Sequence, residues 1–129
     1  MTKITIITAT FNSDKTILET IISVKKQSYQ NIQHIFIDGG SNDNTINIIK
    51  KNMKKKTSIL ISEKDEGIYH AMNKGIKLAR GKIIFILNSD DTFYNKKVVE
   101  KIVNIFKKDN KLDLLYGKWI YTKNKKITR

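Results

Sequence analysis

The chain has 129 residues, of which 40% are hydrophobic and 29% are charged, and it contains no cysteine. This size and composition indicate one soluble globular domain, and the lack of cysteine excludes disulfides and thiolate metal sites. Every apolar run is far shorter than the roughly 20 residues of a membrane span, and the chain starts in a strand-like run with no signal peptide before it, so we expect a cytoplasmic protein.

The formal net charge of +13 is distributed unevenly along the chain. Seven of the 12 acids fall in three loops that follow predicted strands: Asp38, Asp43, Glu63, Asp65, Glu66, Asp90 and Asp91. Basic residues gather at Lys50, Lys51, Lys54, Lys55 and Lys56, and again at Lys118, Lys123, Lys125, Lys126 and Arg129. The pattern favours a cation in an acidic pocket and an anionic partner outside. The alternative is a solvated lysine surface without a partner.

The first half of the chain predicts two strand-then-helix units. The apolar run Ile4–Ala9 is typical of a buried strand, and the residues after it that would cap a helix are Asn12, Ser13 and Asp14. The apolar face of that helix would consist of Ile17, Leu18, Ile21 and Ile22. Residues 35–37 predict a second strand that ends at Asp38. The helix that follows would point three residues inward, namely Ile46, Ile49 and Met53.

The second half repeats this pattern. Residues 59–61 predict a third strand, and the next helix has apolar or small residues at regular helical spacing, namely Ile68, Ala71, Met72, Gly75, Ile76 and Ala79. Gly81 is placed to end that helix in a left-handed cap. A fourth strand is predicted at 83–87, and a last helix would bury Val98, Val99, Ile102, Val103 and Phe106. Residues Leu112–Tyr116 predict a further strand, and residues 119–121 one more.

Four such units in succession predict an α/β fold with three layers, α/β/α, around a mostly parallel sheet, in one domain over residues 1–129. No Gly-x-Gly-x-x-Gly follows the first strand. The spacing from Gly75 to Gly81 is one residue too long for a P-loop, and Ile83 stands where the P-loop hydroxyl belongs. His34 and His70 are not at metal-ligand spacing, so we expect both to be satisfied or exposed.

Two adjacent carboxylates, Asp90 and Asp91, follow the fourth predicted strand directly. In open α/β sheets, ligands bind at the carboxyl ends of strands. Neighbouring carboxylates repel each other unless a cation or donor groups lie between them. The alternative is a simple turn in which Asp91 caps a backbone N–H.

Four segments resemble, in order, the motifs of family two glycosyltransferases, over residues 3 to about 122. They are residues 6–12 (IITATFN), 37–45 (IDGGSNDNT), 62–75 (SEKDEGIYHAMNKG) and 87–91 (LNSDD). The resemblance implies a truncated GT-A fold, a nucleotide-diphosphate sugar donor (a UDP-sugar), a divalent cation and inversion at the anomeric carbon.

The resemblance also implies roles for individual residues. Base and ribose would be held by Thr8, Ala9, Thr10, Asn12 and Asp38, while Asp65, Gly67, Asn73 and Gly75 would lie beside the nucleotide. For Asp38 the alternative is a turn cap for Gly40 or Ser41. Asp90 would contact ribose, and Asp90 and Asp91 would bind Mg²⁺ or Mn²⁺, for which oxygen ligands are suited. Asn88 stands where many relatives have an aspartate, and His70 replaces an expected acid.

An inverting transfer needs a carboxylate base, and in this family the base lies in a second half that binds the acceptor. The acids after Asp91 are Glu100, Asp109 and Asp113, which are better explained as helix surface and turn residues. We therefore identify no catalytic residue and expect the base beyond Arg129. The chain would be the donor-binding half of an enzyme of surface polysaccharide or glycan synthesis, with a glycan or lipid-linked acceptor.

Two alternatives are a nucleotide-sugar-binding fragment that catalyses nothing and a basic nucleic-acid-binding domain. Nucleic acid is the less favoured partner and is not expected, because four aromatic residues fall inside core patterns instead of between lysines: Phe11, Phe36, Phe85 and Phe106. The lysines at 50–56 are compatible with peripheral contact at the anionic inner face of the membrane.

Overall fold

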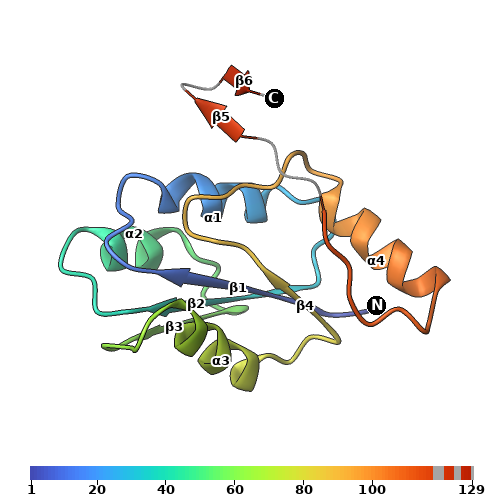
Figure 1. The fold of residues 1–129 in the computed structure, drawn as a ribbon, viewed down its shortest axis with the longest axis horizontal. Helices are drawn as coiled ribbons and strands as arrows, with labels where there is room; N and C mark the ends of the chain where they lie inside the picture. Colours follow the sequence, from blue (N-terminus) through green and yellow to red (C-terminus); the bar gives the residue numbers. More distant parts are fainter. Residues whose placement is uncertain (118–120, 124–125, 129) are drawn as a thin grey trace.

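The computed structural model describes residues 1–117, 121–123 and 126–128 of the chain (Figure 1). Its centre is a four-stranded sheet in the order β3-β2-β1-β4, in which all pairings are parallel. The strands are β1 (Ile4–Thr10), β2 (Ile32–Asp38), β3 (Ser58–Ser62) and β4 (Ile83–Ile86). The four predicted strands and the parallel sheet are thus confirmed, although β2 begins three residues earlier than its apolar run suggested.

Helices cover both faces of the sheet. On one face lie α1 (Ile17–Lys25), α2 (Thr45–Asn52) and α4 (Val98–Lys108), and on the other lies α3 (Ile68–Leu78) (Figure 1). This arrangement confirms the predicted α/β/α layers.

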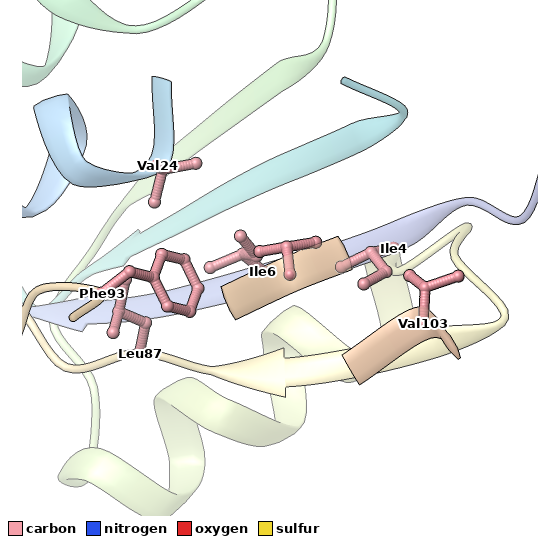
Figure 2. Close-up of a cluster of buried hydrophobic side chains, with 7 residues drawn as sticks. Ile4, Ile6, Val24, Leu87, Phe93 and Val103 are labelled. Atoms are coloured by element: carbon pink, nitrogen blue, oxygen red, sulfur yellow. The ribbon is translucent and has the colours of Figure 1, made fainter. Parts of the chain in front are cut away.

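The core follows from the alternation of side chains along the strands. Ile4 and Ile6 of β1 point toward α1 and α4, where they pack with Val24 and Val103 (Figure 2). The intervening Ile7 points to the opposite face and packs with Ala71 of α3. Strand β1 is therefore buried on both sides, as its continuous apolar run predicts.

Helix α1 is rotated relative to the prediction. Leu18 and Ile22, which were expected to face inward, are exposed, whereas Thr20 and Val24 are buried. The polar Thr20 is accommodated inside because its hydroxyl donates hydrogen bonds to backbone carbonyls of the loop after β4. A periodic pattern of apolar residues carries no information about such a distant partner.

The left-handed cap predicted at Gly81 is wrong, because the residues with positive φ in the described part of the chain are Asn12, Gly40 and Gly67. Helix α3 instead ends at Leu78 without such a cap. Gly81 lies against the backbone of β1, where a Cβ atom would approach the Thr5 nitrogen to 2.4 Å. A close contact between main chains, not a turn, requires glycine here.

The strand predicted at Leu112–Tyr116 is also wrong, since this segment has no regular structure. Its apolar pattern finds no strand to pair with among the described residues, and Leu114 and Tyr116 are exposed. Two short strands follow, β5 (Tyr121–Lys123) and β6 (Lys126–Thr128), which pair with each other in antiparallel fashion. Of the predicted run 119–121, Trp119 and Ile120 lie outside the described residues.

Strand β4 forms one edge of the sheet, since its pairing partner within the described part of the chain is β1 alone. Two of its side chains on the α3 face, Ile84 and Ile86, are 41% and 38% exposed. None of the described helices is both long and apolar enough to cross a bilayer.

Candidate functional site

A cleft of about 580 Å³ opens at the carboxyl end of the sheet, between the ends of β1 and β4. It is lined by residues 12–16 of the loop between β1 and α1, residues 88–90 after β4, Ala9 and Ile68. The chain places β2 and β3 on one side of β1 and then β4 on the other, so the strand order reverses between β1 and β4. Ligands of open α/β sheets bind at such a reversal.

The loop after β4 brings Asp90 and Asp91 to this cleft region. It begins with a turn in which the Asp91 N–H donates to the Asn88 carbonyl at 3.1 Å. Asp90 is exposed and Asp91 is half-buried. Burial raises the pKa of Asp91, the negative charge of Asp90 raises it further, and the side-chain amide of Asn88 opposes this rise. The two carboxylates are therefore close enough to repel each other.

The residues of this loop suit a hard cation. The buried Oδ1 atom of Asn88 has no hydrogen-bond partner within the described part of the chain, and an unsatisfied buried oxygen is costly. Together with the carboxylates of Asp90 and Asp91 it offers oxygen donors, which Mg²⁺ and Mn²⁺ prefer. Among the described residues, no group of three or more His, Cys, Asp or Glu side chains gathers around one point. A cation here would therefore need oxygens from its ligand or from water.

The loop between β1 and α1 is held against the loop that follows β2. The Asn12 N–H donates to Ser41 Oγ at 2.8 Å, and Asn12 Oδ1 accepts from the Asn42 N–H at 3.0 Å. The Ser13 N–H donates to Thr45 Oγ1 at 2.8 Å. Asn12, Ser13 and Asp14 were expected to cap α1, but the N-cap residue is Thr16, which makes no side-chain cap bond. These side chains instead build one wall of the cleft.

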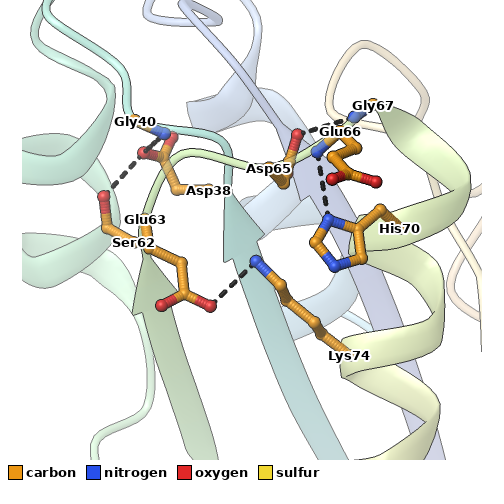
Figure 3. Close-up of polar contacts among 9 residues, drawn as sticks. All are labelled: Asp38, Gly40, Ser62, Glu63, Asp65, Glu66, Gly67, His70 and Lys74. Atoms are coloured by element: carbon orange, nitrogen blue, oxygen red, sulfur yellow. Dashed lines mark hydrogen bonds and ion pairs between the residues drawn. The ribbon is translucent and has the colours of Figure 1, made fainter.

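Asp38, at the end of β2, is fully buried. Its carboxylate accepts hydrogen bonds from the Gly40 N–H and from the Ser62 hydroxyl (Figure 3). It also accepts from the N–H and the hydroxyl of Ser41. This geometry matches the turn cap that was considered as the alternative for this residue. Contact of Asp38 with a base or ribose stays a prediction.

The three residues at the end of β1 differ in their access to the cleft. Ala9 lines it. Thr8 is buried on the α1 side of the sheet, where its hydroxyl is hydrogen-bonded to His34 Nε2 at 2.9 Å. Thr10 is also buried, and its Oγ1 has no hydrogen-bond partner among the residues that the structure describes. Nucleotide contacts by these residues stay predictions.

Asp65 links the ends of β2 and β3. Its carboxylate accepts from the Gly67 N–H at 3.0 Å (Figure 3). It also lies so close to Gly39 that a Cβ there would be 3.2 Å from Oδ2. Gly67 has φ +112 and precedes the first residue of α3, a conformation that disfavours any other residue. The hydrogen bond and salt bridge from Lys74 lower the pKa of the neighbouring Glu63.

Asn73 and Gly75 do not line the cleft. Asn73 is exposed on α3, and Gly75 is buried against β1, where a Cβ would approach Ile7 Cγ2 to 2.5 Å. Seven cleft residues were not predicted as site residues, namely Ser13, Asp14, Lys15, Thr16, Ile68, Asn88 and Ser89. The signal that could have found them is their position, since residues 13–16 follow the first motif directly and the other three lie within the motifs at 62–75 and 87–91.

Comparison with known proteins decides the family. The model of glycosyl transferase family 2 matches residues 5–127. The chain belongs to this family.

Relatives of this family member are about twice its length. It is 35% identical over 123 residues to an uncharacterised glycosyltransferase of Haemophilus influenzae, covering 94% of the chain and 48% of the relative. It is 30% identical over 115 residues to the PGL/p-HBAD biosynthesis glycosyltransferase of Mycobacterium tuberculosis, covering 87% and 44%. The chain thus spans less than half the length of these curated relatives.

Solved structures share the fold of the glycosyltransferase chain. Staphylococcus aureus TarS 1–349 in complex with UDP-GlcNAc superposes with a TM-score of 0.75 at 25% identity, over 82% of the chain and 31% of TarS. The mannosyltransferase PcManGT from Pyrobaculum calidifontis, in complex with GDP-Man and Mn²⁺, gives a TM-score of 0.75 at 22% identity, over 81% and 32%. Both are GT-A enzymes, which confirms the predicted fold.

Proposed function

We propose that this chain is the donor-binding part of a glycosyltransferase and binds a UDP-sugar in the cleft between β1 and β4. The observation that carries the proposal is the position of this cleft at the reversal of strand order, with Asp90 and the unsatisfied Asn88 oxygen beside it. TarS, at 25% identity, was solved with UDP-GlcNAc, which favours uridine as the base.

In this proposal, Asp90, Asp91 and Asn88 hold a Mg²⁺ or Mn²⁺ ion through oxygen atoms. When bound, the cation would stabilise negative charge on the leaving nucleotide diphosphate. The chain's own residues shape the cleft, which is lined by the loops at residues 12–16 and 88–90 and by Ala9. The side chain of Asn12 is held in place by its bond to Asn42.

Transfer to an acceptor would need a base that we do not assign within the described residues. Glu100 forms a salt bridge with Lys97 at 3.0 Å and accepts from the Ser28 hydroxyl at 3.1 Å. Asp109 accepts from the Lys111 N–H at 3.0 Å. These contacts support structural roles for both acids. The acceptor would be a glycan or a lipid-linked saccharide, and the proposed process is surface polysaccharide or glycan synthesis.

Calorimetric titration of the purified chain with UDP tests the proposal. We expect binding in the presence of Mn²⁺, and we expect Asp91→Ala or an excess of chelator to weaken it at least tenfold. The matched control is Asp113→Ala, which removes an exposed carboxylate far along the chain and should leave the affinity unchanged. Equal binding with and without the cation would overturn the metal site, and the absence of any binding would overturn the nucleotide site as well.

We also propose that this enzyme makes peripheral contact with anionic membranes through a lysine surface. This lysine surface consists of Lys25, Lys26, Lys50, Lys51, Lys54, Lys55 and Lys56, all of which are exposed. The two groups are adjacent, because Lys25 Nζ donates to the Asn52 carbonyl and Lys54 Nζ donates to Gln30 Oε1.

The position and pairing of these lysines favour a partner outside the protein. They lie in or just after the last turns of α1 and α2, before β2 and β3 begin, so they lie near the amino ends of these strands, away from the cleft. Within the described part of the chain, salt bridges form at Lys74–Glu63 and Lys97–Glu100 and not in the lysine surface. Each lysine near an anionic bilayer contributes about 1 kcal/mol, so several together suffice for reversible association.

A further inference from the structure

Thr20 of α1 makes a contact that helix propensity does not explain. The residue is fully buried, and the single proton of its hydroxyl is shared between the carbonyl of Asp91, 2.7 Å from Oγ1, and that of Ser89, 3.1 Å from Oγ1. A threonine inside a helix commonly donates to a carbonyl of the preceding turn of its own helix. Here the hydroxyl points across to another element and binds the backbone on both sides of Asp90.

Two further polar residues, one on α1 and one just after it, make similar contacts with the segment that connects β4 to α4. Ser23 Oγ accepts from the Phe93 N–H at 3.2 Å. Gln27, which is also buried, donates through Nε2 to the Asn95 carbonyl at 2.7 Å and accepts through Oε1 from the Val99 N–H at 3.1 Å. The stripe formed by Thr20, Ser23 and Gln27 therefore holds the chain from residue 89 to the start of α4.

The loop that is held in this way carries an internal repulsion. Asp90 and Asp91 are neighbours in the chain and both carry carboxylates, so like charges lie close together in this loop. Thr20 fixes the carbonyls that flank Asp90, and Ser13 Oγ lies 2.9 Å from Ser89 Oγ on the cleft side. These contacts restrain the backbone of residues 89–91, which carries the two carboxylates that repel each other.

We propose that Thr20 is a positioning residue that holds Asp90 and Asp91 in the geometry needed for the cation and the diphosphate. This inference rests on the proposed function, because it assigns a task to Thr20 within the same site. Thr20 touches neither the cation nor the nucleotide and acts through the loop backbone. Groups that orient metal ligands in this way typically alter metal affinity 10- to 100-fold.

The test compares Thr20→Val with Thr20→Ser, and Thr5→Val serves as a matched control. Thr5 is also fully buried and its hydroxyl also takes part in two hydrogen bonds, with Gln33 and with the Gly81 N–H, but at the opposite end of β1. Two binding measurements are made. The affinity for Mn²⁺ at saturating UDP is measured from the electron paramagnetic resonance signal of the free ion, and the affinity for UDP is measured without a cation. Thr20→Ala is a second variant without the hydroxyl, should Thr20→Val fold poorly.

We expect Thr20→Val and Thr20→Ala to weaken Mn²⁺ binding at least tenfold while the affinity for UDP without cation stays within twofold of wild type. Thr20→Ser should restore Mn²⁺ binding, and Thr5→Val should lose thermal stability without losing Mn²⁺ affinity. Unchanged Mn²⁺ affinity in Thr20→Val, in a wild type that binds Mn²⁺, would overturn the positioning role alone. A wild type that binds neither Mn²⁺ nor UDP would overturn the proposed function, and this inference with it.

Discussion

The Nε2 atom of His34 and the hydroxyl of Thr8 lie 2.9 Å apart on neighbouring strands, both buried beneath α1. The His34 ring also packs on Phe36 with the centroids 3.9 Å apart. Burial lowers the pKa of His34 from 6.5 to about 3. The imidazole is therefore neutral in the folded protein at neutral pH, as expected for a satisfied core histidine.

This buried histidine predicts a dependence of stability on pH. Between pH 6.5 and about 3, the unfolded chain binds a proton on His34 that the folded chain does not. The free energy of unfolding should then fall as the pH drops below 6.5, by up to about 1.4 kcal/mol per pH unit. Urea unfolding at pH 7.0, 6.0 and 5.0 measures this slope. His34→Gln should flatten it, whereas His70→Gln, at an exposed position on α3, should not. An unchanged slope in His34→Gln would contradict the assignment.

Gly75 is expected to be required for packing. A Cβ there would lie 2.5 Å from Ile7 Cγ2, and Ile7 is fully buried. Gly75→Ala should therefore destabilise the chain by about 1–3 kcal/mol despite the better helix propensity of alanine. Chemical denaturation checks this value. Gly117→Ala, where a Cβ would meet nothing within 4 Å, is the control and should be near neutral.

Asp91→Asn should separate stability from cation binding. In the absence of a cation, the variant loses the repulsion from Asp90 and should be slightly more stable than wild type, by less than about 1 kcal/mol. Thermal melts with and without Mn²⁺ provide the measurement, because a ligand of the folded state raises the melting temperature. Wild type should show a Mn²⁺-dependent rise with UDP present, and Asp91→Asn should show none. A full Mn²⁺ response in the variant would remove Asp91 from the site.

Transfer of sugar by the isolated chain is expected to be undetectable, and slow hydrolysis of the donor to be its highest activity. The reason is that Glu100 and Asp109 are engaged in structural contacts. Assays of UDP release from UDP-GlcNAc, with and without saccharide acceptors, check this expectation. Acceptor-dependent release that is lost in Glu100→Gln or Asp113→Asn would show that one of these acids is the base.

The lysine surface predicts binding to anionic vesicles that weakens with salt. Replacing Lys54, Lys55 and Lys56 with glutamine should remove most co-sedimentation with phosphatidylglycerol vesicles at low salt. Replacing Lys107, Lys108 and Lys111, which are equally exposed but lie at the end of α4 and just beyond it, is the control with the same loss of charge. Equal binding to neutral vesicles, or a preference for duplex DNA over vesicles, would count against a membrane partner.

The sequence predicted the elements of the sheet because a strand buried on both faces, such as β1, needs a run that is nearly all apolar or β-branched. The packing of α4 was predicted for a similar reason, since Val99 and Val103 recur at helical spacing and both are buried. The local pattern of apolar residues predicted the structure wherever burial of those residues alone determines it.

Reasoning from local pattern failed where a partner distant in the sequence determines whether a residue is buried or must be glycine. Thr20 is buried because of carbonyls about 70 residues away, and Gly81 is a glycine because of the backbone of β1. In the candidate site, the position of the loop containing Asp90 and Asp91 was predicted from the apolar strand before it and from the resemblance of residues 87–91 to a family motif. The carboxylate of Asp38 is buried and accepts four hydrogen bonds, three from the turn at residues 40–41 and one from Ser62 of β3. The spacing of residues in the sequence does not predict these contacts.

The exposed edge of β4 has a practical consequence for work with this chain in solution. Within the described part of the chain no strand pairs with the outer side of β4, so its main-chain groups beside the exposed Ile84 and Ile86 form a template on which another copy can add its own edge strand. We therefore expect self-association that grows with protein concentration and resists salt, because main-chain bonds and apolar contacts hold it. Titrations near 1 µM protein would then report on the monomer, in which the cleft end of β4 is open. Titrations near 1 mM would report on the associated form, in which another copy lies beside it.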